Sequence, residues 1–267
     1  MADTAADNGI QFADLEFHES IGVGLFGTVH RGEYLGTEVA IKECSHDTTF
    51  DFEKYFAREV DMLRAARHPN VVQFMDVCKH ENRFFIITEY IPNGNLKTWI
   101  EDEARMLAWP QRISFAVDVA RALAFLHARD IIHRDIKGEN LLVTENGRIK
   151  VCDFGFSRIA AQDEDEMKRI SYCGTDGYMA PEIMLGMEFD TAVDVFSFGV
   201  VLCELVCRCT TDAGVFTRAV PGFGIDADTV TDNATEGCPD GLLQLALRCT
   251  QALPEDRPCW PEILAEL

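Results

Sequence analysis

The chain has 267 residues, of which 47% are hydrophobic and 26% charged, the balance of a globular protein long enough to bury its own core. Its 24 Lys and Arg stand against 45 Asp and Glu, so the formal net charge is −21. Nucleic acids and anionic membranes bind basic surfaces, and we therefore expect neither as a partner.

The first third of the chain predicts a small β-rich lobe. Residues 1–14 begin with a polar run and are expected to form a flexible N-terminal tail. Residues 15–44 alternate apolar and polar side chains with glycines between them, which predicts antiparallel strands. Apolar spacing of about 3.6 predicts a helix over residues 50–67, and the β-rich runs 70–78 and 83–91 predict two more strands.

From a hinge near residues 88–95 onward, the pattern becomes helical. Pro110 opens an amphipathic helix over residues 110–129, because proline is tolerated in a first helical turn. Asn146-Gly147 favours a tight hairpin turn between two short strands. The remaining predicted elements are strands at 140–143 and 148–151, a buried helix at 191–207, a loop-rich stretch at 208–240, and helices at 241–251 and 259–267.

These elements predict an α+β fold with two lobes. The smaller lobe, residues 15–91, should hold a five-stranded antiparallel sheet and one helix. The larger lobe, residues 92–267, should be mainly helical.

The ten cysteines form no pair of C-x-x-C units, so no structural zinc site is expected. Cys203, Cys207 and Cys209 lie in an apolar helical stretch and are interpreted as small core residues. Unpaired thiols in this number suit a reducing compartment. No apolar run reaches the length of about 18 residues that a membrane span needs, so no membrane span is expected. The predicted location is cytoplasmic.

Residues 22–29, GVGLFGTV, place glycines between two predicted strands. Glycines let a backbone fold closely over phosphate groups, because no Cβ blocks the approach. A dinucleotide-binding fold would need a helix directly after this pattern, but another strand pattern follows. Alone, the pattern also fits an ordinary glycine-rich hairpin.

The next predicted strand contains the run Val39-Ala40-Ile41, and Lys42 follows it directly. Such a lysine could merely be exposed, but near the glycine loop it could hold the α- and β-phosphates of a nucleotide. It then needs a carboxylate to fix it, and the 50–67 helix offers Glu59, with Glu53 as the alternative. Glu59 is favoured because it lies one helical turn from Leu63, which should pack inward.

Residues 133–140, HRDIKGEN, follow a predicted helix and precede a strand. Asp135 could accept the proton of a substrate hydroxyl, and Lys137 could neutralise a moving phosphate. Asn140 offers an oxygen to a metal ion, and Asp153, after the next strand, could bind Mg²⁺ that bridges phosphates. Each motif alone is ambiguous, but their order and spacing together indicate phosphoryl transfer.

From about residue 15 to its end, the chain resembles the eukaryotic protein kinase family. The resemblance rests on the motifs above, on Ala180-Pro181-Glu182, on Asp194 in the run 194–199, and on Asp256-Arg257-Pro258. It implies a bilobal protein kinase fold, with ATP and Mg²⁺ (Mn²⁺ as the alternative) as cofactors and protein hydroxyls as acceptors. It also implies a buried ion pair between Glu182 and Arg257, and backbone anchoring of the catalytic loop by Asp194.

The resemblance further implies a nucleotide pocket. Its residues would be Ile21, Gly22, Gly24, Gly27, Val29, Ala40, Lys42, Thr88, Glu89, Ile91 and Leu142. Val29, Ala40 and Leu142 would sandwich the adenine ring. Thr88 would be the gatekeeper, and the backbones of Glu89 and Ile91 would offer hydrogen bonds. A hydrophobic column linking the lobes would consist of Leu63, Phe74, His133 and Phe154.

Lys137, two residues after Asp135, and Thr175 resemble the pattern of serine/threonine kinases. Residues 196–205 resemble the tyrosine-kinase-like group, and residues 221–226 are similar to LIM kinases and testis-specific protein kinases. LIM kinases usually lack a lysine at the place of Lys137, so the chain departs from them there.

Three alternatives stay open at this stage. A dual-specificity kinase would share the same motifs. A pseudokinase scaffold would need the loss of Lys42, Asp135 or Asp153, and all three are present. A small-molecule phosphotransferase is disfavoured by residues 180–182 and 256–258, which would frame a platform for a protein substrate.

The resemblance implies a switch in the activation segment, residues 153–182. Arg134 would bind a phosphate there and order the segment. Candidate acceptors are Ser171, Tyr172 and Thr175, and Ser171 is favoured because it follows Lys168-Arg169 and aligns with the phosphorylated threonine of LIM kinases. An upstream activating kinase is then an expected partner.

Acidic residues in the same segment bear on the substrate. The run 163–166, DEDE, fits either a solvated loop or a selector of basic substrates, and Glu139 could add to such a selector. The expected partner is therefore a protein substrate that is basic around its acceptor.

Overall fold

The computed structural model describes residues 9–24, 27–44, 52–154, 158–159 and 176–267. The chain divides into two compact units: Met1–Arg67 with Val72–Ile91, and His68–Val71 with Pro92–Leu267. Residues 68–71 join the second unit because Val71 pairs with Val151, and because Asn70 Nδ2 donates to the Ile149 carbonyl at 2.9 Å.

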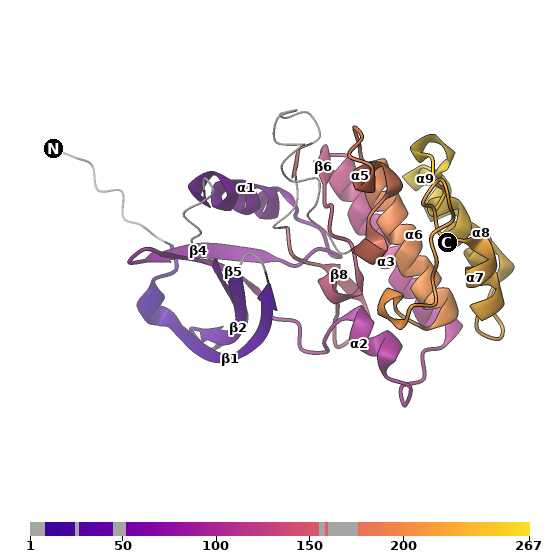
Figure 1. The fold of residues 1–267 in the computed structure, drawn as a ribbon. Coiled ribbons are helices and arrows are strands. Elements are labelled where there is room, and N and C mark those ends of the chain that lie inside the picture. Colours follow the sequence, from indigo (N-terminus) through magenta and orange to yellow (C-terminus); the bar gives the residue numbers. More distant parts are fainter. Residues whose placement is uncertain (1–8, 25–26, 45–51, 155–157, 160–175) are drawn as a thin grey trace. The chain divides into compact units, whose positions relative to one another are not determined.

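The first unit is built on an antiparallel sheet of five strands in the order β1-β2-β3-β5-β4 (Figure 1). The strands are β1 (Leu15–Gly24), β2 (Gly27–Tyr34), β3 (Thr37–Cys44), β4 (Phe74–His80) and β5 (Arg83–Glu89). The strands predicted over residues 15–44 and 83–91 are confirmed. The strand expected from residue 70 begins instead at Phe74.

One face of this sheet is covered by an apolar cluster. Val39 and Ile41 on β3, and Phe85 and Ile87 on β5, are fully buried in it. They alternate along their strands with the half-buried Ala40, Lys42 and Thr88, as the period of two in a strand requires.

The predicted tail over residues 1–14 is wrong for its second half. Ile10 is buried, and its N–H donates to Asp76 Oδ2 at 3.0 Å. The Phe12 ring stacks on His80 with centroids 4.0 Å apart and lies 5.2 Å from Phe85. Burial of these two apolar side chains against the sheet outweighs the polar character of their neighbours. Residues 1–8 lie outside the described part of the chain.

The helix predicted over residues 50–67 is confirmed as α1 (Phe52–Ala65). Val60 and Leu63 are buried, so the inward face expected from the apolar spacing is present. The Ala66 N–H donates to the Met62 carbonyl at 2.8 Å and closes the last turn. Pro69 follows, and it cannot continue a helix.

The second unit is mainly helical (Figure 1). Its described helices are α2 (Leu96–Glu101), α3 (Trp109–His127), α5 (Pro181–Met184), α6 (Ala192–Cys207), α7 (Ala227–Asn233), α8 (Asp240–Cys249) and α9 (Trp260–Glu266). The four predicted helices correspond to α3, α6, α8 and α9. Periodicity missed α2, α5 and α7, which have 6, 4 and 7 residues and so span too few turns to show a repeat.

The centre of this unit is α6, in which every residue after Ala192 is buried. It packs against α3, α7 and α8. A Cβ on Gly199 would lie 2.6 Å from Cys249 Cβ, so the close approach of α6 and α8 requires glycine at this position. Cys203 and Cys207 are buried in α6 as predicted, but Cys209 lies beyond its end and is only half-buried.

Short strands frame the loops of the second unit. The predicted hairpin is confirmed as β7 (Leu141–Val143) and β8 (Ile149–Val151), with Gly147 at its turn in the left-handed region (φ +68°). A second pair joins β6 (Ile131–Ile132) to β9 (Arg158–Ile159). No helix in the described part of the chain combines the length and apolar character needed to cross a membrane. Within the same residues, no three His, Cys, Asp or Glu side chains cluster as a metal site.

Candidate active site

The sheet face opposite the apolar cluster carries several of the predicted nucleotide-binding residues. Lys42 lies opposite Val29 on β2 and Ile86 on β5, and Ala40 lies opposite Thr88. Directly opposed residues point to the same face of a sheet, and so do residues two apart on one strand. The register therefore brings Val29, Ala40, Lys42 and Thr88 together on one face.

The glycine pattern forms the β1–β2 hairpin. Ile21, Gly22 and Gly24 lie on β1, and Gly24 pairs with Gly27 across the hairpin. Gly27 has a φ of +133°, and a Cβ there would lie 1.9 Å from the Glu43 carbonyl oxygen. The close approach of β2 to β3 therefore demands this glycine, whatever the hairpin binds.

For the other predicted site residues of this unit, the structure gives only their place in the fold. Glu59 and Glu53 lie in α1, at positions whose side chains are outside the described part. The strand β5 ends at Glu89, whose carbonyl accepts a hydrogen bond from the Thr88 hydroxyl at 3.3 Å. Ile91 is the last residue of the unit.

In the second unit, the β6–β7 loop (residues 133–140) is held by the buried carboxylate of Asp194 on α6. Asp194 Oδ2 accepts the His133 N–H at 2.7 Å, and Oδ1 accepts the Arg134 N–H at 2.8 Å. His127 Nε2 lies 2.8 Å from Oδ2. Burial alone would raise the pKa of Asp194, but the bonds from His127 and the His133 backbone outweigh it and lower that pKa. The loop backbone is thus fixed at its first two residues.

The loop presents Asp135 with two donors on one oxygen. Lys137 Nζ lies 3.0 Å from Asp135 Oδ2, and Asn140 Nδ2 donates to the same oxygen at 2.9 Å. Asn140 Nδ2 also donates to the Asp135 carbonyl at 2.7 Å. These charge-assisted bonds orient the Asp135 carboxylate. Since the Asn140 amide nitrogen is used here, its Oδ1 is the atom that could bind a metal ion.

Asp153 directly follows Cys152, whose N–H donates to the Asn140 carbonyl at 2.9 Å. Asp153 has a φ of +60°, which is uncommon for a residue with a side chain and is typical of functional sites. His133 Nε2 lies 3.0 Å from the Cys152 carbonyl, and its ring lies 5.0 Å from Phe154. The oxygens of Asn140 and Asp153 are of the kind that Mg²⁺ prefers, so these residues fit a magnesium ion.

The predicted site residues thus fall into two groups, one in each unit. Leu142 belongs to the second group, where it lies on β7 opposite Lys150 and is half-buried. Arg134 has a φ of +71°, and its guanidinium lies 5.2 Å from the Phe189 ring. The predicted phosphorylation sites Ser171 and Thr175 lie outside the described residues.

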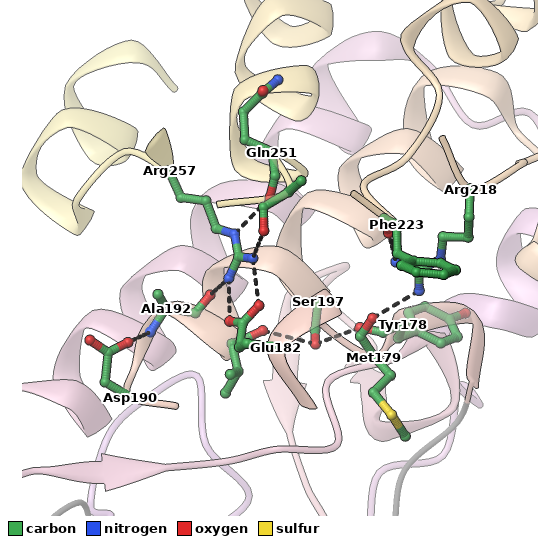
Figure 2. A network of polar contacts seen from close by, with 12 residues as sticks. Tyr178, Met179, Glu182, Asp190, Ala192, Ser197, Arg218, Phe223, Gln251 and Arg257 are labelled. Atoms are coloured by element: carbon green, nitrogen blue, oxygen red, sulfur yellow. Dashed lines mark hydrogen bonds and ion pairs between the residues drawn. The ribbon is translucent and has the colours of Figure 1, made fainter. Parts of the chain in front are cut away.

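Glu182 and Arg257 form a buried ion pair (Figure 2). Arg257 Nη1 and Nη2 donate to the two carboxylate oxygens of Glu182 at 2.6 and 2.7 Å. The other three guanidinium donors reach the carbonyls of Ala192, Gln251 and Ala252 at 3.0, 2.9 and 3.1 Å. All five N–H groups of the guanidinium are therefore satisfied, which is what burial of this cation requires.

The segment just before Glu182 is held by hydrogen bonds from two further side chains. Arg218 Nη2 donates to the carbonyls of Gly177 and Met179 at 3.0 and 2.9 Å. Ser197 Oγ donates to the Tyr178 carbonyl at 2.9 Å (Figure 2). The backbone of residues 177–179 is thereby tied to α6 and to the loop that follows it.

Sequence reasoning missed a buried carboxylate, Glu204 on α6. The Tyr178 hydroxyl donates to Glu204 Oε1 at 2.6 Å, and the Thr211 N–H donates to the same oxygen at 2.9 Å. Burial raises the pKa of Glu204 to about 8, although both hydrogen bonds act to lower it. Sequence reasoning also missed His127 on α3. The signal that could have found both is a titratable residue inside an apolar helical run.

Comparison with known proteins identifies the family of the chain. Residues 15–267 match the family described as protein tyrosine and serine/threonine kinase. The chain is 41% identical over 259 residues to RasGEF domain-containing serine/threonine-protein kinase X of Dictyostelium discoideum. The aligned region covers 97% of this chain and 27% of that protein.

Two further relatives come from the same organism. Probable serine/threonine-protein kinase kinX is 39% identical over 95% of this chain and 23% of its own length. Probable serine/threonine-protein kinase kinY is 39% identical over 99% of this chain and 48% of its own length. The chain therefore spans between about a quarter and a half of these relatives.

Replacing Arg257 should destabilise the protein strongly. Arg257→Met leaves Glu182 buried without its cation, and we expect a loss of about 3–5 kcal/mol in the free energy of unfolding. Arg248→Met is the matched control, because Arg248 pairs with Glu266 at the surface and should cost less than about 1 kcal/mol. Denaturant unfolding measures both, and equal losses would contradict the role given to the buried pair.

Glu204 should make stability depend on pH. Its pKa is raised from 4.5 to about 8 in the folded protein, so the stability present below pH 4.5 is lost as pH rises through 8. Glu204→Gln cannot ionise and keeps an oxygen for Tyr178 and Thr211. Between about pH 6 and pH 9, wild type should lose on the order of 2 to 3 kcal/mol relative to this variant.

Thermal unfolding across this pH range checks the prediction. Glu145→Gln, at an exposed glutamate in the β7–β8 turn, is the control and should follow wild type. If the melting temperatures of wild type and Glu204→Gln changed equally with pH, Glu204 would not titrate in this range.

Proposed function

This chain belongs to the protein tyrosine and serine/threonine kinase family, and we propose that Asp135 is the catalytic base of its ATP-dependent serine/threonine kinase activity. The observation that carries the proposal is the Asp135 carboxylate, oriented by Lys137 at 3.0 Å and by Asn140 at 2.9 Å. In this position Asp135 orients the substrate hydroxyl and receives its proton. Lys137 neutralises charge on the transferred phosphoryl group.

We assign Mg²⁺, with Mn²⁺ as the alternative, to Asn140 and Asp153. Support comes from their oxygen donors and from the hydrogen bond between the Asn140 carbonyl and the N–H of Cys152, the residue before Asp153. When bound, the ion supplies charge neutralisation at the phosphates. Asn140 Oδ1 and the Asp153 carboxylate would hold the ion, while Asn140 Nδ2 donates to the Asp135 carboxylate.

The nucleotide is assigned to the sheet face of the first unit. Val29 and Ala40 share that face with Lys42, which is supported by their register. Lys42 would hold the α- and β-phosphates, and Glu59 would fix Lys42. Leu142, Glu89 and Ile91 remain assigned to the adenine ring by the family resemblance alone.

A protein substrate with basic residues near its acceptor fits the net charge of −21. One expected contributor, Glu139, already pairs with Lys97 at 2.9 Å, and Lys97 also pairs with Asp212. A substrate cation at Glu139 would therefore have to displace Lys97. The acidic run 163–166, which lies outside the described residues, remains the stronger candidate selector.

Membership of the tyrosine-kinase-like group, near the LIM kinases and testis-specific kinases, is a finer proposal. It rests on residues 196–205 and 221–226. Phosphorylation of cofilin would support it, and failure to phosphorylate cofilin beside activity on other proteins would count against it. A reducing, cytoplasmic location is proposed from the number of cysteines in the sequence.

Asp135→Asn should abolish phosphoryl transfer. Loss of the base is expected to lower kcat by several powers of ten, at about 1.4 kcal/mol per tenfold. The measurement is radiolabel transfer from ATP to a degenerate peptide library, with Glu145→Gln, at an exposed position in the β7–β8 turn, as the control. Equal transfer by Asp135→Asn and wild type would refute the proposed role of Asp135.

The same library tests the basic substrate and two alternative functions. Enrichment of Lys and Arg around serine and threonine supports the basic substrate, and no enrichment dismisses it. Label on tyrosine as well would identify a dual-specificity kinase, and no transfer by wild type would identify a scaffold.

Ser171→Ala should lower activity if phosphorylation of the activation segment orders it through Arg134. We expect the variant to stay at the basal rate after treatment with an activating kinase, while wild type and Tyr172→Phe rise. The readout is peptide phosphorylation together with the mass of the modified segment. Full activation of Ser171→Ala would exclude this site.

A further inference from the structure

A chain of hydrogen bonds joins α9 to the β6–β7 loop through buried side chains. Trp260 Nε1 lies 2.6 Å from His127 Nδ1, and His127 Nε2 lies 2.8 Å from Asp194 Oδ2. We propose that Trp260 is a positioning residue: it fixes His127 in the one tautomer that can hold Asp194, and through Asp194 it holds the loop that carries Asp135. We call Trp260, His127 and Asp194 the indole relay.

The indole decides the tautomer because its N–H can only donate. His127 Nδ1 must therefore accept, and a neutral imidazole that accepts at Nδ1 carries its proton on Nε2. Nε2 faces a carboxylate oxygen of Asp194, which accepts that proton's hydrogen bond. The other tautomer would set two N–H groups against each other at Trp260 and two acceptors against each other at Asp194.

The selected tautomer completes the set of donors around Asp194. Oδ2 receives His127 Nε2–H and the His133 N–H, and Oδ1 receives the Arg134 N–H. Asp194 is fully buried, so water cannot replace a donor that is lost. Loss of the His127 bond should therefore loosen the backbone directly before Asp135.

The Trp260 ring is also held by packing that does not need its N–H. Its centroid lies 5.6 Å from Phe198 and 5.3 Å from His127, and the residue is 9% exposed. Trp260→Phe therefore removes the donor and leaves an aromatic ring in place. Trp109→Phe is the matched control, because Trp109 Nε1 donates at 3.0 Å to the carbonyl of Glu236, in the connection between α7 and α8.

Nitrogen-15 NMR of the histidine side chains tests the tautomer in the full chain and needs no turnover. His127 is assigned by the signals that vanish in His127→Gln. We expect wild type and Trp109→Phe to carry the His127 proton on Nε2. Trp260→Phe should add a second population that carries its single proton on Nδ1 and therefore offers Asp194 no donor. A proton on Nδ1 in wild type, or an unchanged spectrum in Trp260→Phe, overturns the proposal.

Kinetics test the positioning role, which rests on the proposed function of Asp135. Trp260→Phe should lower kcat about three- to tenfold, with the KM for ATP and the melting temperature close to those of Trp109→Phe. In a His127→Gln background the amide always offers Asp194 a donor, so Trp260→Phe should then have little further effect.

The double-mutant cycle separates positioning from packing. An equal loss of kcat from Trp260→Phe in both backgrounds means that Trp260 only packs, and it overturns the proposal. Inactive wild-type protein with the expected spectra would contradict the proposed function while supporting the tautomer assignment.

Discussion

The structure of the second unit depends on one constraint: a carboxylate buried at the start of α6 must be surrounded by donors. Asp194 satisfies it with the backbone N–H groups of His133 and Arg134 and with the imidazole of His127. A buried charge without such partners would cost several kcal/mol, so helix and loop are locked to each other. The hydrogen bonds to Asp194 thereby position the β6–β7 loop and its side chains, including Asp135.

The segment before α6 follows the same principle with a different balance. The Glu182–Arg257 pair uses every donor of the guanidinium, so its burial is fully compensated. Glu204 is compensated less well, because in the described chain only one of its two buried oxygens has a partner. Burial therefore raises the pKa of Glu204 more than its hydrogen bonds lower it.

Much of the fold and part of the site could be predicted from local patterns. Alternation along β3 places Lys42 and Ala40 on the face opposite Val39 and Ile41, because the period of a strand is two. The spacing within residues 133–140 brings Lys137 and Asn140 to Asp135, since a loop of this length confines them. Short elements such as α2 and α7 escaped prediction, because fewer than about three turns carry no periodic signal.

The sequence by itself therefore determined the strands, the long helices and the residues of the β6–β7 loop, since burial periods and short-range spacing are local properties. Only the tertiary structure decided which distant groups meet. It docked Ile10 and Phe12 on the sheet, paired Lys97 with Glu139, and set Trp260 against His127. Such contacts join residues far apart in the chain, and they are selected by the packing of whole elements, which no short pattern records.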